Sequence, residues 1–329
     1  MDDDRYLWDK SGLPDPEVER LERLLGPLGH RVERRLPWRP RGPTVAFLAA
    51  TVAVILAGGV LWIVRTVDRP DWSVARIAGA PAAGAHSVGE ARQLGIGQLL
   101  ETDAASSARL TARFIGQVTV EPNSRLRLVR ARASHHRLAL ERGAISARIW
   151  APPRLFFVET PSALAVDLGC VYRLSVDDRG SGLLSVETGW VALEQGERTA
   201  IVPADASCSI RPEAGPGTPS FRSADPAFRQ ALERIDSVPE NAEALGTLLS
   251  RARPKDSLTL WHLLGSLPPP ANLRVYDRLA GFVQPPRGVT REGIARRDGR
   301  MIDLWRAQLG LPSPEKLSLW QRAVRAVVR

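Results

Sequence analysis

The sequence contains very little lysine and few sulfur-containing residues. Three of its 45 basic residues are lysines, and the 329 residues include two cysteines and two methionines. Common catalytic patterns are missing as well: there is no P-loop, G-x-G-x-x-G, G-x-S-x-G, H-E-x-x-H or C-x-x-C. These absences argue against phosphate-binding loops, α/β-hydrolases, zincins and dithiol chemistry. They predict a protein that is not an enzyme, with no catalytic residues, no cofactor and no metal site.

One long apolar run is present, TVAFLAATVAVILAGGVLWIV, which extends from Thr44 to Val64 without a charge. A hydrocarbon core about 30 Å thick needs roughly 20 helical residues to cross it. The run therefore predicts one transmembrane helix. A buried core helix and a cleavable signal peptide are the other interpretations. A signal peptide fits poorly, because the run starts late and is followed by Arg65 rather than by a small-residue cleavage site.

Charge around the run predicts its orientation. Five arginines precede it within about 15 residues and three follow it, which favours a cytoplasmic N-terminus. The chain is therefore expected to cross the membrane once, with its N-terminus in the cytoplasm and its C-terminal part on the far side. The formal net charge is +9. We interpret the basic C-terminal region as a solvated surface and expect no direct contact with nucleic acid.

The N-terminal segment has a helix with clear start and stop signals. Asp15 can cap it, Pro16 suits its first position, and Gly26-Pro27 ends it. About 28 residues cannot bury a core of their own. The segment therefore predicts a partner-binding surface, with a helix lying on the membrane as the alternative. The predicted contact residues are Tyr6, Trp8, Val18, Leu21 and Leu25.

The middle of the chain alternates polar and apolar residues with period two, which predicts short strands. Two strands flank a turn at Pro122-Asn123-Ser124, and HRLALERGAISARIW gives two more, broken at Gly143. Further turns are predicted at residues 177–182, at Gly189 and at Gly196. This pattern indicates an all-β domain of short antiparallel strands.

The order of these strand motifs resembles the FecR domain family. Phe157, Val158 and Thr160 match one element of that family's pattern, and Leu168, Gly169 and Tyr172 match the next, although Cys170 stands where Thr is usual. A third element is matched by Val186, Gly189 and Val191. The resemblance covers roughly residues 94–215.

That resemblance implies a single-pass regulator of the bacterial inner membrane, which couples an external sensor domain in the periplasm to a cytoplasmic head. The head would bind an extracytoplasmic-function sigma factor, and the sensor domain would meet an unknown envelope protein or ligand. The N-terminal segment departs from zinc-binding anti-sigma heads, because it contains no cysteine and His30 alone is nearby. The sequence leaves the sign of the regulation open.

After Asp225 the pattern changes to helices separated by Pro or Gly. Asp225-Pro226 and Pro239-Glu240 each predict a helix start, and Thr290 predicts a cap. The fold class is thus multidomain: one transmembrane helix, an all-β FecR-like domain and an all-α C-terminal domain. The predicted boundaries are 1–43 for the head, 44–64 for the membrane helix, 65–92 for a flexible linker, 93–222 for the β domain and 223–329 for the helices.

Three smaller features invite chemical interpretation. His135-His136 predicts a solvated turn rather than a metal site, because neighbouring side chains of a strand face opposite sides. Asp177-Asp178 predicts a polar hairpin tip. Cys170 and Cys208 are candidates for a disulfide in an oxidising compartment. Two buried free thiols that act as small apolar residues are the alternative.

Two functions therefore fit the sequence. The first is a transmembrane signalling regulator that binds a sigma factor. The second is a membrane-anchored envelope module that binds a glycan, a lipid or a protein and has no role in transcription.

Overall fold

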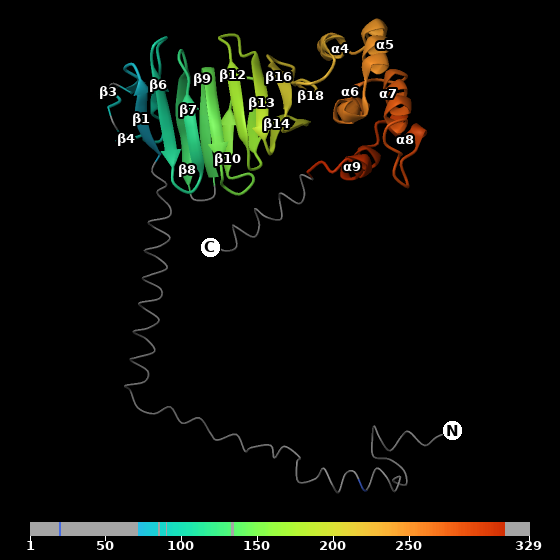
Figure 1. Ribbon diagram of the computed structural model, residues 1–329, viewed down its shortest axis with the longest axis horizontal. Helices are drawn as coiled ribbons and strands as arrows, with labels where there is room; N and C mark the ends of the chain where they lie inside the picture. The colour runs from blue at the N-terminus through green and yellow to red at the C-terminus, as the bar shows by residue number, and fades with distance from the viewer. Residues whose placement is uncertain (1–19, 21–71, 85, 90, 133–134, 313–329) are drawn as a thin grey trace. The chain divides into compact units, whose positions relative to one another are not determined.

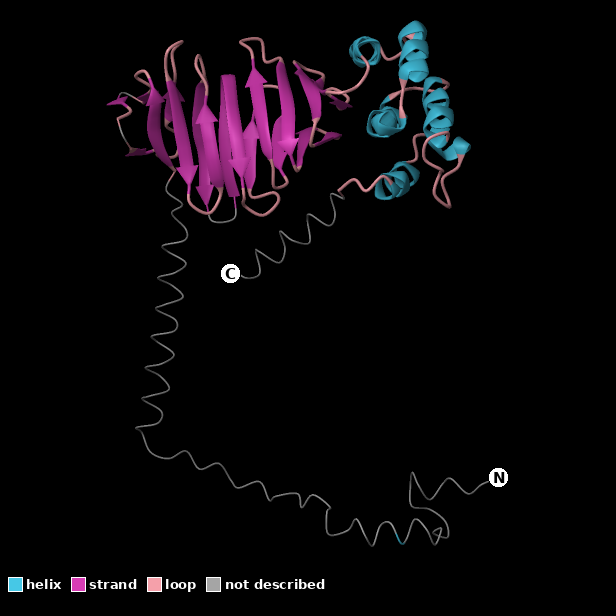
Figure 2. Ribbon diagram, viewed as in Figure 1, coloured by secondary structure: helices cyan, strands magenta, loops and turns pink. Residues whose placement is uncertain are grey.

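A computed structural model describes residues 20, 72–84, 86–89, 91–132 and 135–312 (Figure 1). Over these residues the chain forms strands first and helices afterwards (Figure 2). The strands join into one 18-stranded mixed sheet that is folded into two layers. Helices follow from residue 226 onward.

We name the two layers sheet A and sheet B. Sheet A contains β1 (Ser73–Ala78), β4 (Arg92–Gln93), β6 (Ser107–Ala112), β7 (Gly116–Val120), β12 (Val171–Val176), β13 (Gly182–Thr188), β16 (Ala206–Arg211), β17 (Gly215–Pro216) and β18 (Ser220–Phe221). Sheet B contains β2 (Ala82–Ala83), β3 (His86–Ser87), β5 (Leu99–Glu101), β8 (Arg125–Arg132), β10 (Phe156–Glu159), β11 (Leu164–Asp167), β14 (Trp190–Gln195) and β15 (Arg198–Pro203).

Strand β9 (His135–Ile149) belongs to both sheets. Its first half pairs antiparallel with β8 and parallel with β10 in sheet B. Its second half pairs antiparallel with β7 and β12 in sheet A. The sequence pattern predicted two strands here, broken at Gly143, and that prediction is wrong. Glycine lets one strand bend at this point while both halves keep their partners.

The bend is fixed by a contact between Gly143 and Ser124. Gly143 has a φ of 89°, and a Cβ atom on it would lie 2.2 Å from Ser124 Oγ. That hydroxyl donates to the Ala144 carbonyl at 3.1 Å and accepts from the Ala144 N–H at 2.9 Å. The Ser124 side chain therefore satisfies the backbone where β9 leaves one sheet and enters the other.

Apolar side chains from both sheets meet in one core between the layers. Alternate residues of β8 and β9 point into it, and Leu126, Leu128, Leu138 and Leu140 are each at most 1% exposed. The tyrosine of β12, Tyr172, packs into the same core from sheet A. Full burial of a leucine is worth about 2 kcal/mol, so the period-two pattern fixes which face of each strand turns inward.

The helices follow the sheets and have their own apolar cluster. They are α4 (Pro226–Ser237), α5 (Ala242–Arg251), a 3-10 turn (Pro254–Asp256), α6 (Ser257–Ser266), α7 (Ala271–Ala280), α8 (Arg291–Ala295) and α9 (Gly299–Gln308). Asp225 caps α4 and Thr290 caps α8, as the sequence predicted. The start of α5 lies at Ala242, slightly beyond the predicted Pro239-Glu240.

The helices do not form a separate all-α domain, so that part of the predicted fold class is wrong. Sheet and helices belong to one compact unit. Trp190 and Phe221 of the sheets pack against the helical cluster, and the Thr259 hydroxyl donates to the Pro219 carbonyl at 2.7 Å. The β part is also not purely antiparallel, because β9 and β10 run parallel. Strands β1 to β4 occupy part of the predicted linker, residues 65–92.

The prediction of a single-pass inner-membrane protein, cytoplasmic at its N-terminus, is also corrected. No helix among the described residues is long and apolar enough to cross a membrane. The run from Thr44 to Val64 on which that prediction depended lies outside the described residues. The predicted location, in the inner membrane with the C-terminal domains in the periplasm, depended on the same helix.

We expect Gly143→Ala to destabilise the fold strongly. The new methyl group would meet Ser124 at 2.2 Å and would hold a non-glycine residue at a φ of 89°. Left-handed strain costs about 1–2 kcal/mol and overpacking about 1–3 kcal/mol more. Urea unfolding should therefore show a loss of about 3 kcal/mol.

Gly196→Ala is the matched control. Gly196 has a φ of 56° in a hairpin, and a Cβ atom on it would meet nothing within 4 Å. The variant should lose only the strain, about 1 kcal/mol. Equal losses in the two variants would show that the contact with Ser124 does not hold the bend.

Candidate functional site

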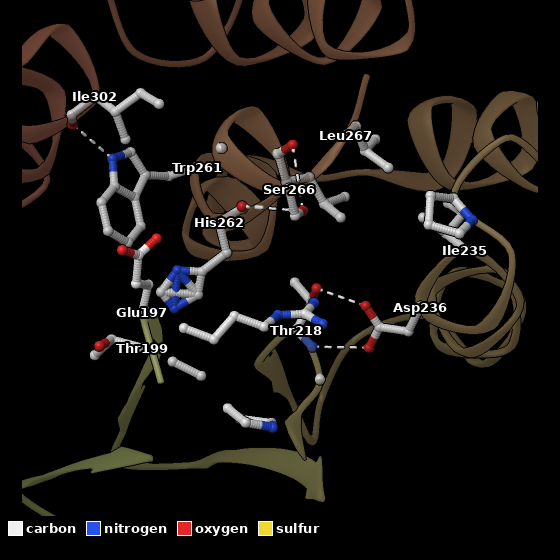
Figure 3. A pocket seen from close by; sticks show the side chains of 17 residues that line it. Glu197, Thr199, Thr218, Ile235, Asp236, Trp261, His262, Ser266, Leu267 and Ile302 are labelled. Carbon is white, nitrogen blue, oxygen red and sulfur yellow. Dashed lines mark hydrogen bonds between the residues drawn. The ribbon is translucent and has the colours of Figure 1, made fainter. Parts of the chain in front are cut away.

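A groove of about 410 Å³ lies where the free edge of sheet B meets the helices (Figure 3). Its walls come from β15, from the segment after β17, and from α4, α6 and α9. This size is within the range of small-molecule sites. The groove is lined by Glu197, Arg198, Thr199, Ala200, Pro216, Gly217, Thr218, Ile235, Asp236, Pro239, Trp261, His262, Leu263, Gly265, Ser266, Leu267 and Ile302.

His262 of α6 holds the edge of β15 at Ile201. The Ile201 N–H donates to His262 Nε2 at 3.1 Å. The same Nε2 lies 3.3 Å from the Ile201 carbonyl, so the tautomer sets whether the ring accepts from the N–H or donates to the C=O. Burial in the groove wall lowers the pKa of His262 to about 3, which keeps the ring uncharged at neutral pH. The histidine therefore replaces the partner strand that an edge N–H would otherwise need.

Asp236 fixes the opposite wall of the groove. Both of its carboxylate oxygens accept hydrogen bonds at 2.7 Å, one from the Thr218 N–H and one from the Thr218 hydroxyl. Asp236 lies in the last turn of α4, where the helix dipole disfavours a negative charge. Gly217 allows this close approach, since a Cβ atom on it would lie 2.6 Å from Asp236 Oδ2.

The remaining wall is apolar. Trp261 donates from Nε1 to the Ile302 carbonyl at 2.8 Å, which links α6 to α9 and orients the indole (Figure 3). Ile235, Leu263 and Leu267 line the groove beside it. The groove thus combines an apolar wall with a polar strand edge, an arrangement that suits binding of an amphipathic ligand.

The two cysteines do not form the predicted disulfide, because both thiols are free and buried. Cys170 directly precedes β12 and Cys208 lies in β16, with β13 between them. Two strand spacings of about 4.8 Å already exceed the roughly 7 Å that a disulfide allows between Cα atoms. Cys170 donates to Asp167 and Cys208 donates to the Gly217 carbonyl at 3.3 Å. Burial raises the pKa of both thiols.

Asp167, beside Cys170, is a buried carboxyl group of the core. It is 1% exposed and accepts from the Gly169 N–H at 2.7 Å. Burial raises the pKa of Asp167 to about 7, although the hydrogen bonds from Cys170 and Gly169 act in the opposite direction.

The other residues singled out in the sequence have mixed outcomes. Tyr6, Trp8, Val18, Leu21 and Leu25 lie outside the described residues, as do Thr44 and Val64.

The His135-His136 pair lies in β9 rather than in a turn. His136 is buried and accepts from Trp72 Nε1 at 3.2 Å, while the His135 ring stacks on Phe157. Asp177-Asp178 forms the predicted hairpin tip, where the Asp177 carboxylate accepts from two backbone N–H groups.

Sequence reasoning did not find the groove. Its main polar residues, Thr199, Thr218, Asp236 and His262, come from four separate segments without a shared motif. His262 was visible as a histidine within an apolar helix, LTLWHLLG, but the strand that it contacts is 61 residues earlier.

Comparison with known proteins finds a partial likeness to solved structures. No protein-family model matches the chain, and no curated protein matches it. Two crystal structures of a "putative anti-sigma factor" from Parabacteroides distasonis are similar to part of it, each at 15% identity and a TM-score of 0.33. The first covers 40% of this chain and 63% of the other protein, and the second covers 46% and 73%. This chain thus matches less than two thirds of the first structure.

The pKa of His262 predicts a loss of stability in acid. Its folded value of about 3 lies below the ordinary 6.5, so the unfolded chain binds more protons between these values and the free energy of unfolding falls as the pH falls below 6.5. The slope is up to about 1.4 kcal/mol per pH unit.

His262→Gln should remove this contribution, so urea unfolding at pH 7, 6 and 5 should give a flatter profile than that of the unsubstituted chain. His86→Gln, at an exposed position, reports the effect of removing a surface histidine. A profile of His262→Gln parallel to that of the unsubstituted chain would contradict a neutral, edge-binding His262.

The raised pKa of Asp167 predicts the opposite dependence of stability on pH. Its folded pKa of about 7 lies above the ordinary value, so the folded chain binds more protons and stability falls as the pH rises from about 4 through 7. Between pH 5 and 7, the unsubstituted chain should lose up to about 1.4 kcal/mol per pH unit relative to Asp167→Asn. Asp178→Asn, in an exposed turn, reports the general effect of removing one carboxylate. Equal slopes for Asp167→Asn and the unsubstituted chain would show that Asp167 is ionised in both states.

Proposed function

We propose that this protein is a signalling regulator of the anti-sigma class. Residues 1–43 bind a sigma factor, specifically one of the extracytoplasmic-function class. The β-sandwich with its helices is the sensing unit, which binds a partner or a ligand. The proposed activity is binding rather than catalysis, with no cofactor and no direct contact with nucleic acid.

The observation that carries this proposal is how the residues of the FecR-like motifs are arranged. Phe157 and Val158 lie in β10, and the two motif glycines form the turns that precede β12 and β14. Gly169 and Gly189 have φ values of 88° and 76°. A Cβ atom on Gly189 would lie 2.1 Å from the Gly169 carbonyl oxygen, so the two turns pack directly on each other.

This contact gives the motif a physical meaning. Each glycine supplies a left-handed turn that other residues rarely adopt, and the second must lack a side chain because the first turn occupies the space. The motif is therefore one structural unit rather than three separate matches. This arrangement of the motif supports a FecR-like sensing unit. The proposal does not rest on the likeness to the two crystal structures.

The groove along β15 favours a second candidate, a binding module with no role in transcription. A ligand could be recognised there without any contribution from residues 1–43. The two candidates differ in whether the N-terminal segment has a protein partner, so a direct binding test of that segment separates them.

The partner test uses the full chain, co-expressed with each extracytoplasmic-function sigma factor of the source organism. At least one should co-purify with the tagged chain. Leu21→Asp together with Leu25→Asp should reduce its recovery more than tenfold, because burial of each leucine is worth about 2 kcal/mol. Arg23→Ser, on the opposite side of the predicted helix, should leave recovery unchanged.

If no sigma factor co-purifies, the regulator proposal fails and the binding module remains. If a sigma factor co-purifies equally well with the double variant, it binds elsewhere on the chain and the proposed helix surface is wrong.

A further inference from the structure

Strand β15 is the last strand of sheet B. It pairs with β14 along one side, and its other side faces α6 and the groove. A free strand edge presents unpaired N–H and C=O groups that can pair with another extended chain. What occupies each outward position of β15 therefore decides what the groove can bind.

Hydrogen bonds of an antiparallel strand point alternately toward and away from its neighbour. The Ile201 N–H donates to His262 at 3.1 Å and so points away from β14. Thr199 and Pro203, two residues to either side, share this direction. Pro203 has no N–H to donate. Ile201 is held by His262. Thr199 is thus the outward position whose backbone N–H and C=O remain available.

Thr199 lies in the groove (Figure 3). The helical side of the same groove is lined by Ile235 and Leu267, which are each 1% exposed, by Trp261, which is 8% exposed, and by the half-buried Ile302. These four side chains are the apolar wall considered for a ligand. An extended peptide has groups that match both sides of the groove. Its main chain can pair with the backbone N–H and C=O of Thr199, and one of its alternate side chains can contact the apolar wall.

We propose that the groove binds a short extended peptide segment of a partner protein. The segment pairs with the backbone of Thr199 as an added strand of sheet B and places one apolar side chain against the wall formed by Ile235, Trp261, Leu267 and Ile302. His262 ends the pairing, because it already holds Ile201. The added strand is therefore limited to two or three residues around position 199.

Two charged side chains of the groove are already hydrogen-bonded within the protein. Asp236 is held by Thr218 through two hydrogen bonds, and Arg198 donates to the Ala214 carbonyl at 3.2 Å. Glu197, the other acidic residue of the groove, is exposed to solvent. Recognition therefore depends on the strand edge and the apolar wall, and not on a buried ion pair. This inference concerns residues 197–302 and stands whether or not residues 1–43 bind a sigma factor.

The test begins with a 12-residue phage-displayed peptide library selected against the full chain. The best-enriched peptide is synthesised, and its Kd is measured by fluorescence anisotropy against the full chain and four variants. Thr199→Pro removes the outward N–H, whereas Thr199→Val keeps it and changes only the side chain. Proline is tolerated at a strand edge whose N–H faces outward, so the fold should persist, and circular dichroism verifies this.

We expect Thr199→Pro to weaken binding at least tenfold and Thr199→Val to change it less than threefold. Ser266→Trp, at an exposed position of α6 that lines the groove, should also weaken binding at least tenfold by filling the space. Ser250→Trp, at an exposed position of α5 outside the groove, should bind as the unsubstituted chain does.

Hydrogen exchange gives a readout that does not depend on substitution. The peptide should slow exchange at the Thr199 amide. A library that yields no peptide sensitive to Ser266→Trp would overturn the proposal. So would equal binding to Thr199→Pro and Thr199→Val. A peptide lost with Ser266→Trp but not with Thr199→Pro would show a pocket that reads side chains alone, and the added-strand geometry would be wrong.

Discussion

The bend of β9 at Gly143 is the constraint on which the rest of the fold depends. One strand supplies the central ladder of both sheets, so the two layers cannot separate without breaking the strand pairing of β9 in one of them. The Ser124 hydroxyl bonds both the N–H and the C=O of Ala144, which leaves no orphaned backbone group at the bend. Because the layers are held at this point, the apolar faces of both sheets turn toward one another and form a single core.

A two-layer sheet leaves open edges, and the helices cover the one that ends sheet B in part, at Ile201. α6 presents His262 to β15, and Thr259 of the same helix bonds the Pro219 carbonyl at 2.7 Å. The helices thus belong to the sandwich rather than to a domain of their own. The groove lies beside this contact, where α4, α6 and β15 meet. The contact between His262 and Ile201 covers this part of the β15 edge and also forms part of the groove wall.

Buried ionisable groups give this unit opposing responses to pH. Burial lowers the pKa values of His262 and His136 to about 3 and about 4, so both histidines are neutral in the fold and disfavour it in acid. Asp167 is a buried carboxyl group whose pKa burial raises to about 7, so it disfavours the fold as the pH rises. The two effects act over the same range, from about pH 4 to 6.5, and there they oppose each other. The groups lie in different parts of the molecule: His136 and Asp167 in the sandwich, and His262 in the wall of the groove.

The sequence alone determined the local features. The turn at Pro122-Asn123-Ser124, the turns at Gly189 and Gly196, and the caps Asp225 and Thr290 were predicted correctly, because a left-handed φ or a capping side chain acts within a few residues. Strand pairing was decided by the tertiary structure, because a period-two pattern shows which face of a strand is buried but not which strand lies beside it. For that reason the sequence could not show that β9 is shared, that β10 runs parallel to it, or that β13 keeps the two cysteines apart. The groove needed the same information, since His262 and Ile201 meet across 61 residues of sequence.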